Sequence, residues 1–251
     1  MNFLSEKQYP FEHRKWNAHE VSYYSDEYIV RALMVSPNAD DIKNINIYLR
    51  GGKGQVGRVR LGRLLQFMRD DSIVVGPYYR GSNGSEGMDE LAGADIEDVV
   101  ALIKMFRHHY PDARINLIAF SRGGLQAMNT LRHEKVHSLL MLNAVSSIYQ
   151  MYEERVDLRG MMRRMVGHPK KDPESYDARE AFLHDIHLPK MLIIHGSIDR
   201  LVDIENARIL IDYLQDKNYP YDYFEFEGER HALTPPSVKR MKNLFWRNVE
   251  E

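Results

Sequence analysis

Apolar and polar positions alternate in a regular order along most of this chain of 251 residues. Short apolar runs predict buried strands at 45–49, 73–76, 115–120, 138–143 and 190–195. Several of the stretches between these runs have apolar residues at helical spacing, about three or four positions apart. Strands that alternate with helices in this way predict a mostly parallel, doubly wound sheet.

Both ends of the chain add strands to this pattern. Residues 21–25 and 27–35 predict an opening hairpin, and the alternating aromatic and polar residues of 221–226 predict a final strand. About eight strands are therefore expected. Helices are predicted at 61–69, at 91–109, from the end of the fifth strand to about 133, at 202–214 and from about 235 onward.

Residues 145–187 interrupt the alternation. The segment is charged, and residues 156–166 show helical periodicity. Because it lies between the sixth and seventh predicted strands, we expect a small helical cap over the carboxyl edge of the sheet, within one domain spanning 1–251. Its methionines either line a substrate site or form the core of the cap, which is the commoner arrangement. They are Met151, Met161, Met162 and Met165.

Composition limits the class of protein. A hydrophobic content of 43% is enough for one sizeable core, and a net charge of −2 offers no electrostatic case for binding nucleic acid or a membrane surface. The absence of cysteine excludes disulfides and thiolate metal sites. The sequence contains no run of about eighteen apolar residues, the length needed to span a bilayer. The first ten residues lack the layout of a signal peptide. We therefore expect a cytoplasmic protein.

The eleven histidines do not predict a metal site. His108, His109, His133 and His137 lack the spacing to an acidic partner that a zinc-binding helix uses, so we interpret them as surface residues. His195 ends a predicted strand, where we expect it to support the following loop by hydrogen bonding. No metal ion and no other cofactor is expected.

The apolar run 115–120 ends at Ser121, and a helical pattern follows. A serine between a buried strand and a helix lies on a sharp turn that exposes its hydroxyl, the arrangement called a nucleophile elbow. The turn needs small neighbours, and Ala119 and Gly123 stand at the two required positions, although Gly is usual at the first. The alternative is that Ser121 only caps the helix, since serine is a preferred N-cap.

Two further residues stand on loops that follow predicted strands. Asp199 follows the strand 190–195, at the edge where the working residues of open α/β sheets lie. Asp203 competes for this role, but it begins the next helix, where the helix dipole explains a carboxylate, so we favour Asp199. His231 follows the final strand. The order Ser121, Asp199, His231 is the chain order of the α/β-hydrolase triad.

The chemistry of this triad needs all three residue types. A serine hydroxyl attacks a carbonyl carbon only when a base takes its proton, the role predicted for His231. Asp199 would hold the histidine tautomer and stabilise the imidazolium. The sequence therefore predicts the α/β-hydrolase fold, with Ser121, Asp199 and His231 as catalytic residues.

The oxyanion of this reaction needs preorganised N–H donors. One is predicted to be the backbone N–H of Arg122, the residue after the nucleophile. The other is expected from Gly52, in a loop where four glycines fall within the seven residues 51–57. Glycine lets a backbone approach a ligand closely, so Gly51 also suits this loop.

A phosphate-binding loop is the alternative for the same residues. The string Gly52-Lys-Gly54-Gln-Val-Gly57 fits a dinucleotide-binding pattern. However, no acidic residue stands at a strand end about twenty positions further on, as that pattern requires. We therefore disfavour nucleotide binding.

Taken together, these segments resemble the catalytic domain of the prolyl oligopeptidase family of serine hydrolases, from about His19 to the C-terminus. Arg50-Gly-Gly stands where the family has a His-Gly-Gly or Tyr-Gly-Gly oxyanion loop, and Ser121-Arg-Gly-Gly is similar to its Ser-Tyr-Gly-Gly elbow. The other matching segments are 77–84, similar to Asn-Tyr-Arg-Gly-Ser-x-Gly, 176–179 before the acid strand, and 195–199 at the acid loop.

The resemblance implies a substrate side of the site at Arg50, Gly51, Tyr79 and Arg122. The two arginines depart from the family pattern, and guanidinium groups favour carboxylates, so an anionic substrate is one alternative. A structural ion pair is the other, and we favour it. We expect Arg50 to brace its loop and hold Arg122 as the stronger candidate for substrate contact. The large N-terminal propeller of the oligopeptidases has no counterpart here, so we expect no selection by substrate size.

We therefore expect a serine hydrolase that cleaves a small ester, an amide or a short peptide bond. Esterase and peptidase need the same triad, so both stay open, as does the oligomeric state. A non-catalytic member of the same fold that binds a ligand or partner is the alternative function, because fold does not dictate function. A metal-dependent hydrolase has no ligand set to support it.

Overall fold

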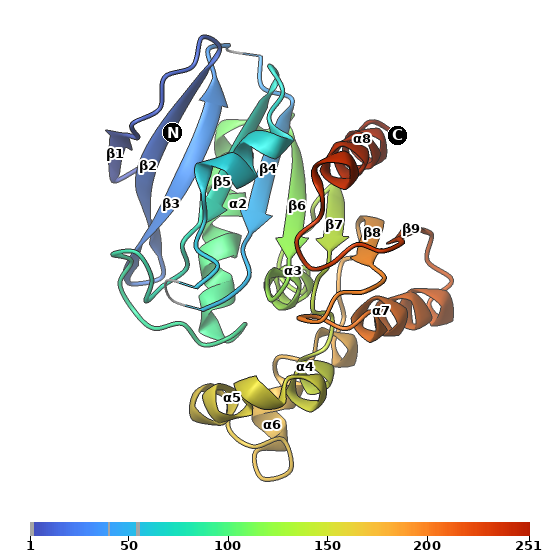
Figure 1. Ribbon diagram of the computed structural model, residues 1–251. Coiled ribbons are helices and arrows are strands. Elements are labelled where there is room, and N and C mark those ends of the chain that lie inside the picture. Colours follow the sequence, from blue (N-terminus) through green and yellow to red (C-terminus); the bar gives the residue numbers. More distant parts are fainter. Residues whose placement is uncertain (1–2, 40, 54–55) are drawn as a thin grey trace.

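The computed structural model describes residues 3–39, 41–53 and 56–251. Gly54, part of the glycine-rich string discussed above, lies outside the described residues. In the part of the chain that is described, nine strands form one sheet in the order β1-β2-β3-β5-β4-β6-β7-β8-β9 (Figure 1). The strands are β1 (Ser5–Gln8), β2 (Trp16–Ser25), β3 (Tyr28–Pro37), β4 (Asn44–Leu49), β5 (Ser72–Pro77), β6 (Arg114–Phe120), β7 (Ser138–Leu142), β8 (Lys190–Gly196) and β9 (Tyr221–Phe226).

The sheet is mostly parallel. Strands β5, β4, β6, β7, β8 and β9 pair in parallel, whereas β1, β2 and β3 add an antiparallel edge next to β5. This confirms the predicted sheet, with one strand more than the eight expected. The additional strand is β1, whose four residues are all exposed. An exposed edge strand has no apolar pattern, so periodicity could not indicate it.

Helices cover both faces of the sheet. They are α1 (Leu61–Leu64), α2 (Glu97–His109), α3 (Gly123–Thr130), α4 (Ile148–Glu154), α5 (Arg159–Met165), α6 (Pro173–Asp177), α7 (Glu205–Asp216) and α8 (Pro235–Glu250). Apolar residues of α2, α3 and α7 belong to one buried cluster with the sheet, and those of α1 and α8 belong to a second. No described helix is both long enough and apolar enough to cross a lipid bilayer.

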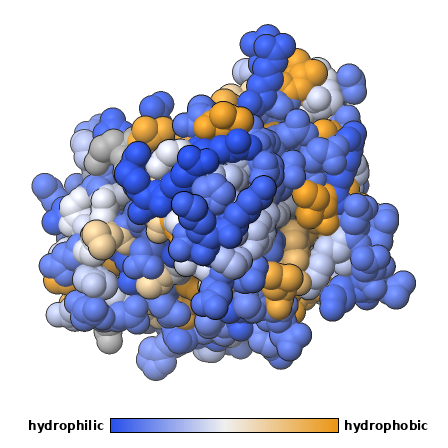
Figure 2. Space-filling view, turned by 90° about the horizontal axis from the view of Figure 1, so that it is seen from below, coloured by the Kyte–Doolittle hydropathy of each residue, from blue (hydrophilic) through white to orange (hydrophobic). Residues whose placement is uncertain are grey.

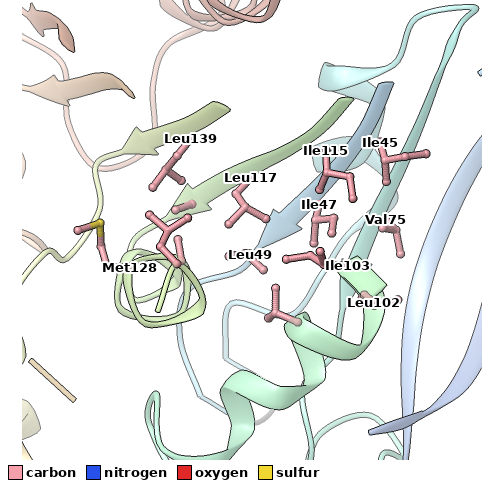
Figure 3. Close-up of a cluster of buried hydrophobic side chains, with 14 of the residues drawn as sticks. Ile45, Ile47, Leu49, Val75, Leu102, Ile103, Ile115, Leu117, Met128 and Leu139 are labelled. Atoms are coloured by element: carbon pink, nitrogen blue, oxygen red, sulfur yellow. The ribbon is translucent and has the colours of Figure 1, made fainter. Parts of the chain in front are cut away.

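The alternation of side chains along each strand divides the core between these two clusters. Ile115 and Leu117 of β6 lie in the first cluster, whereas Ile118 lies in the second. Figure 3 shows the first cluster, in which Leu102 and Ile103 of α2 face the strands. Both faces of the central strands are therefore buried, which explains why they appear in the sequence as continuous apolar runs.

Three predicted helices are shorter than expected. The helix predicted from residue 91 begins at Glu97, after a short 3₁₀ turn at Ala94–Ile96. Leu91 and Ala92 have φ angles of 57° and 61°, outside the helical range, although both are buried. Leu91 fitted the apolar spacing of a helix because it is buried, although its backbone is not helical. Likewise, α1 is followed by a 3₁₀ turn at Leu65–Phe67, and α3 ends at Thr130.

Helices α4, α5 and α6 lie between β7 and β8 in the sequence, and they sit beyond the carboxyl ends of the central strands (Figure 1). Met151 and Met162 are buried in a cluster with Tyr152 and Tyr176, and Met161 and Met165 pack against it. Viewed from below, the molecule presents a mostly hydrophilic surface with separate apolar groups (Figure 2).

Candidate active site

Ser121 lies on a sharp turn between β6 and α3. Its φ of 57° is in the left-handed region, which L-residues rarely adopt. Neighbouring segments approach closely: a Cβ added to Gly51 would lie 2.6 Å from Ser121 Cβ, and one added to Gly123 would lie 2.1 Å from the Leu49 carbonyl oxygen. Small residues are therefore needed at both positions. The N-cap of α3 is Arg122, so Ser121 does not occupy the capping position that the alternative required.

The structure brings Asp199 and His231 into direct contact. Nδ1 of His231 donates to Oδ2 of Asp199 at 2.7 Å, and the other carboxylate oxygen accepts the N–H groups of Leu201 and Val202. Asp203 instead accepts the N–H of Glu205, two residues further along the chain. Of the two carboxylates weighed from the sequence, Asp199 is the one paired with the histidine.

Burial alone would raise the pKa of Asp199. The hydrogen bond and charge of His231, together with the two backbone N–H groups, outweigh burial and hold the pKa below its ordinary value. The carboxylate is therefore ionised when His231 is neutral. Because Nδ1 carries the shared proton, Nε2 of a neutral His231 has a free lone pair, as a general base requires.

His195 supports the loop that carries Asp199 through a hydrogen bond. Its ring is buried, Nε2 lies 3.0 Å from the Val202 carbonyl oxygen, and the same nitrogen lies 3.8 Å from Oδ2 of Asp199. Burial lowers the pKa of His195, so the ring is neutral and donates to Val202. This is the supporting hydrogen bond that its position at a strand end predicted.

Ser121 and His231 line one cavity of about 380 Å³. The Phe120 ring lies 4.8 Å from the His231 ring, centroid to centroid. Glycines 51 and 52 form one side of the cavity, and side chains from the segment between β7 and β8 form another. The apolar side chains of the lining are Val56, Phe120, Val145, Met151, Leu158, Met161, Leu201 and Val202.

Arg50 and Tyr79 do not face this cavity. Both side chains are fully buried. The Arg50 guanidinium donates to the carbonyl oxygens of Tyr78 and Gly51 and to Oγ of Ser82, at 2.9 to 3.0 Å, and thereby braces the loop. The Tyr79 hydroxyl donates to the Arg50 carbonyl oxygen at 3.4 Å. Tertiary packing buries both side chains, so the structure does not place these two predicted substrate-binding residues at the cavity, whereas the expected bracing role of Arg50 fits the structure.

The Arg122 side chain is held in a buried ion pair. Its guanidinium donates to Asp89 at 2.8 Å and to Asp95 at 3.4 Å, and Asp95 also accepts from Gln126. Burial would lower the pKa of Arg122, but the two carboxylates raise it, so the charge is retained. Arg122 contributes to the cavity lining, yet its charge is already neutralised. The favoured alternative of a structural ion pair therefore fits the structure, and the guanidinium is not available to a substrate.

Replacing Arg122 with methionine should lower the free energy of unfolding by about 3–5 kcal/mol, because Asp89 and Asp95 would stay buried without a counter-charge. Urea unfolding measures this loss. Arg155→Met is the matched control: Arg155 lines the same cavity, but its partner Asp157 is exposed, so about 1 kcal/mol or less is expected. Unchanged stability of Arg122→Met, with a selective loss of activity on acidic substrates, would restore the substrate-contact interpretation.

Glu154 and Asn143 are two residues of the site that the sequence did not indicate. Glu154 ends α4 and lines the cavity, and Oε2 accepts from the Asp203 N–H at 3.3 Å and from Nδ2 of Asn206 at 3.0 Å. The contact joins α4 to the start of α7. Burial, with the nearby Asp203 charge, raises the pKa of Glu154 to about 7. No local pattern marks it, because its partners lie about fifty residues further along.

The raised pKa of Glu154 predicts a pH-dependent stability. The folded state binds this proton more tightly than the unfolded chain, so Glu154 destabilises the fold as pH rises from its ordinary pKa to about 7. Glu154→Gln should remove this effect and melt above the wild type at about pH 8 but not at about pH 4. Thermal unfolding at both values tests this. Glu153→Gln, next to it but exposed, is the control, and equal behaviour of the two variants would contradict the prediction.

No cluster of three or more histidine, aspartate or glutamate side chains that could hold a metal ion occurs among residues 3–39, 41–53 and 56–251. Ser121 and His231 bring a hydroxyl and an imidazole to the cavity, and the carboxylate of Asp199 binds the imidazole.

Comparisons with known proteins agree with this geometry. The chain matches the model of the prolyl oligopeptidase family over residues 61–245. It is 32% identical over 246 residues to the uncharacterized peptidase YtmA of Bacillus subtilis strain 168, covering 95% of each chain. It is also 27% identical over 173 residues to the inactive dipeptidyl peptidase 10 of Rattus norvegicus, covering 63% of this chain and 21% of that protein.

Among solved structures, a puromycin-hydrolyzing peptidase of Mycobacterium tuberculosis superposes with a TM-score of 0.80 at 18% identity, covering 96% of this chain and 40% of that one. The chain thus spans about two fifths of that peptidase and about a fifth of the dipeptidyl peptidase, but nearly all of YtmA. Given the family match over most of the chain and the shared architecture, this chain belongs to the prolyl oligopeptidase family of serine hydrolases and has the α/β-hydrolase fold.

Proposed function

We propose that the chain cleaves amide, short peptide or ester bonds through an acyl-enzyme on Ser121, with His231 as base and Asp199 as its partner. The observation that supports this most directly is that Ser121, on a left-handed turn, shares one cavity with a histidine whose Nδ1 is bound to a carboxylate. A histidine hydrogen-bonded to a carboxylate, beside a half-buried serine on a strained turn, suits nucleophilic catalysis.

In the proposed reaction, Oγ of Ser121 attacks the carbonyl carbon while its proton passes to Nε2 of His231. The tetrahedral intermediate collapses as the imidazolium gives this proton to the leaving amine or alkoxide, and an acyl ester on Ser121 remains. Water then attacks the ester with His231 again as base, the acid is released, and Ser121 regains its proton. Asp199 stabilises the imidazolium in both halves of the reaction.

Backbone N–H groups would stabilise the oxyanion. We assign one to Arg122 and the other to Gly52, in the loop packed against Ser121. The buried ion pair of the Arg122 side chain and the hydrogen bonds of Arg50 hold the two segments that carry these donors. Fixed donors need little reorganisation when the charge develops, which is the basis of this kind of stabilisation.

The lining of the cavity suggests what kind of acyl group it accepts. Most of the lining side chains are apolar, and Met151 and Met161 come from the proposed cap, residues 145–187, within a single domain spanning 1–251. A flexible methionine wall adapts to different apolar groups. We therefore propose acyl groups with an apolar side chain as substrates. A cytoplasmic location and the absence of nucleic-acid and membrane partners stay predictions.

A panel of substrates tests this proposal. Aminoacyl anilides and short acyl esters with apolar side chains should be hydrolysed, and each should exceed its glutamyl counterpart in kcat/KM by about 10-fold or more, because a charged group would lose its hydration in the cavity. The ratio of anilide to ester turnover separates peptidase from esterase. No turnover of any member, together with no labelling by a fluorophosphonate, would favour the non-catalytic alternative, for which the inactive dipeptidyl peptidase relative is a precedent.

A further inference from the structure

Asn143 lies at the carboxyl end of β7, directly after Leu142. It is fully buried, and its φ of 44° is in the left-handed region that asparagine tolerates better than most residues. In the sheet order β6-β7-β8-β9, the end of β7 lies between the strand that leads to Ser121 and the strand that leads to Asp199. Its position therefore places it among the loops of the proposed catalytic site.

The side chain of Asn143 joins two of these loops. Nδ2 donates to the carbonyl oxygen of His231 at 2.9 Å and to that of Arg230 at 3.2 Å. Oδ1 accepts the N–H of Gly196 at 2.8 Å, at the end of the strand that leads to Asp199. The amide thus donates to the histidine loop, residues 227–234 between β9 and α8, and accepts from the acid loop, residues 195–199. These bonds set the distance between the two loops.

The backbone of Asn143 is also held. Its N–H donates to the Ile194 carbonyl oxygen at 2.9 Å, and the neighbouring Leu142 carbonyl oxygen accepts the Ser121 N–H at 3.4 Å. The amide group therefore stands on a segment that contacts both β8 and the nucleophile turn. A rigid base of this kind is what a side chain needs to position another group accurately.

The histidine loop is also hydrogen-bonded to the start of α8. The carboxylate of Glu229 accepts the N–H and the hydroxyl of Thr234 and the hydroxyl of Ser237. These bonds hold the loop where it meets α8, whereas Asn143 holds it at the backbone carbonyl groups of Arg230 and His231. His231 lies between Glu229 and Thr234 in the chain, so both sets of bonds restrain the segment that carries it.

We propose that Asn143 is a positioning residue for catalysis: it fixes the main chain of His231 relative to the acid loop, so that Nδ1 stays bonded to Asp199 and the imidazole keeps its place in the cavity that it shares with Ser121. This inference rests on the proposed function. Its physical basis is that a misplacement of about 1 Å in a catalytic group can cost about 10²-fold in rate. Asn143 itself touches no reacting atom.

Asn143→Gly is the most direct test, because glycine accepts the left-handed φ while the amide is removed. We expect kcat on the best substrate of the panel to fall by about 10²-fold, KM to change by no more than a few-fold, and fluorophosphonate labelling of Ser121 to slow in parallel. Asn143→Asp keeps an acceptor for Gly196 and the tolerance for this φ, but it offers no donor to the two carbonyl groups. It should lose kcat to a similar extent.

Asn129→Ala is the matched control. Asn129 is equally buried and also donates to two backbone carbonyl oxygens, those of Leu125 and Arg179, but it lies within α3. Loss of the Asn129 amide should lower the free energy of unfolding, while kcat of the folded variant stays within a few-fold of the wild-type value. The low-field proton resonance of the His231 Nδ1–H, identified by its absence in His231→Gln, should persist in Asn129→Ala and broaden or vanish in both Asn143 variants.

The outcomes separate this inference from the proposed function. Turnover retained by Ser121→Ala would remove the proposed function itself. If Ser121→Ala is inactive but a folded Asn143 variant keeps the wild-type kcat and the His231 resonance, the positioning role is wrong. An equal loss of kcat in Asn129→Ala would likewise overturn it, because general destabilisation would then explain the effect. If Asn143→Gly does not fold, Asn143→Asp supplies the same comparison.

Discussion

Replacing Ser121 with alanine should reduce hydrolysis by about 10⁶-fold and abolish labelling by a fluorophosphonate. The hydroxyl is the only group in the proposed mechanism that bonds covalently to the acyl carbon, so its loss leaves only water as the nucleophile. The fold should tolerate the change, because alanine keeps the Cβ that packs against Gly51 and the turn loses only one oxygen atom. Turnover is measured with the best substrate of the panel, and folding by thermal unfolding.

Ser197→Ala provides the control for this experiment. Ser197 lies on the acid loop, where its hydroxyl accepts the Gly228 N–H. It has no bond to the histidine among the described residues, so its variant should keep both labelling and turnover to within a few-fold. If Ser121→Ala retained turnover, or if Ser197→Ala lost labelling to the same extent, the assignment of the nucleophile would be wrong.

Replacing Asp199 with asparagine should lower kcat by roughly 10⁴-fold. The amide can donate to Nδ1 of His231, which would then place the histidine proton on Nε2, where the base needs a lone pair. The two N–H groups of Leu201 and Val202 that bind the carboxylate can still bind an amide oxygen. We therefore expect a folded protein with intact substrate binding. Steady-state kinetics should show the loss in kcat with little change in KM.

Asp203→Asn is the matched control for the acid. Asp203 lies four residues further along, is exposed, and accepts the Glu205 N–H rather than a histidine proton. Its replacement should change kcat by no more than a few-fold. Equal losses in the two variants would show that the effect comes from the charge of the loop and not from the bond to His231.

The elements closest to the site could be predicted from local pattern alone. The central strands are buried on both faces, so each appears in the sequence as a short apolar run, and Ser121 and Asp199 each follow such a run. His231 follows the edge strand β9, which appears as an alternation of aromatic and polar residues. The strained turn at Ser121 needed small neighbours, which the sequence displays at Ala119 and Gly123. Features that depend on a few consecutive residues could therefore be predicted from the sequence.

The partners of the arginines were not accessible in this way. The carboxylates that bind Arg122 come from Asp89, in a loop, and from Asp95, in the 3₁₀ turn Ala94–Ile96. The carbonyl groups that bind Arg50 come from Gly51 and Tyr78. An arginine beside a catalytic motif has the same appearance in a sequence whether it faces a substrate or a buried acid. Only its three-dimensional surroundings distinguish the two.

By itself, the sequence determined the mostly parallel sheet, the elbow serine and the order of the three candidate catalytic residues, because strand burial and turn sterics act over a few neighbouring positions. Only the tertiary structure decided that Asp199 rather than Asp203 meets His231, that Tyr79 and Arg50 are buried, and that Asn143 ties the acid and histidine loops together. These contacts join residues that are distant in the sequence. They depend on which strands are neighbours in the sheet, and a hydrogen bond between distant residues leaves no periodic pattern in the chain.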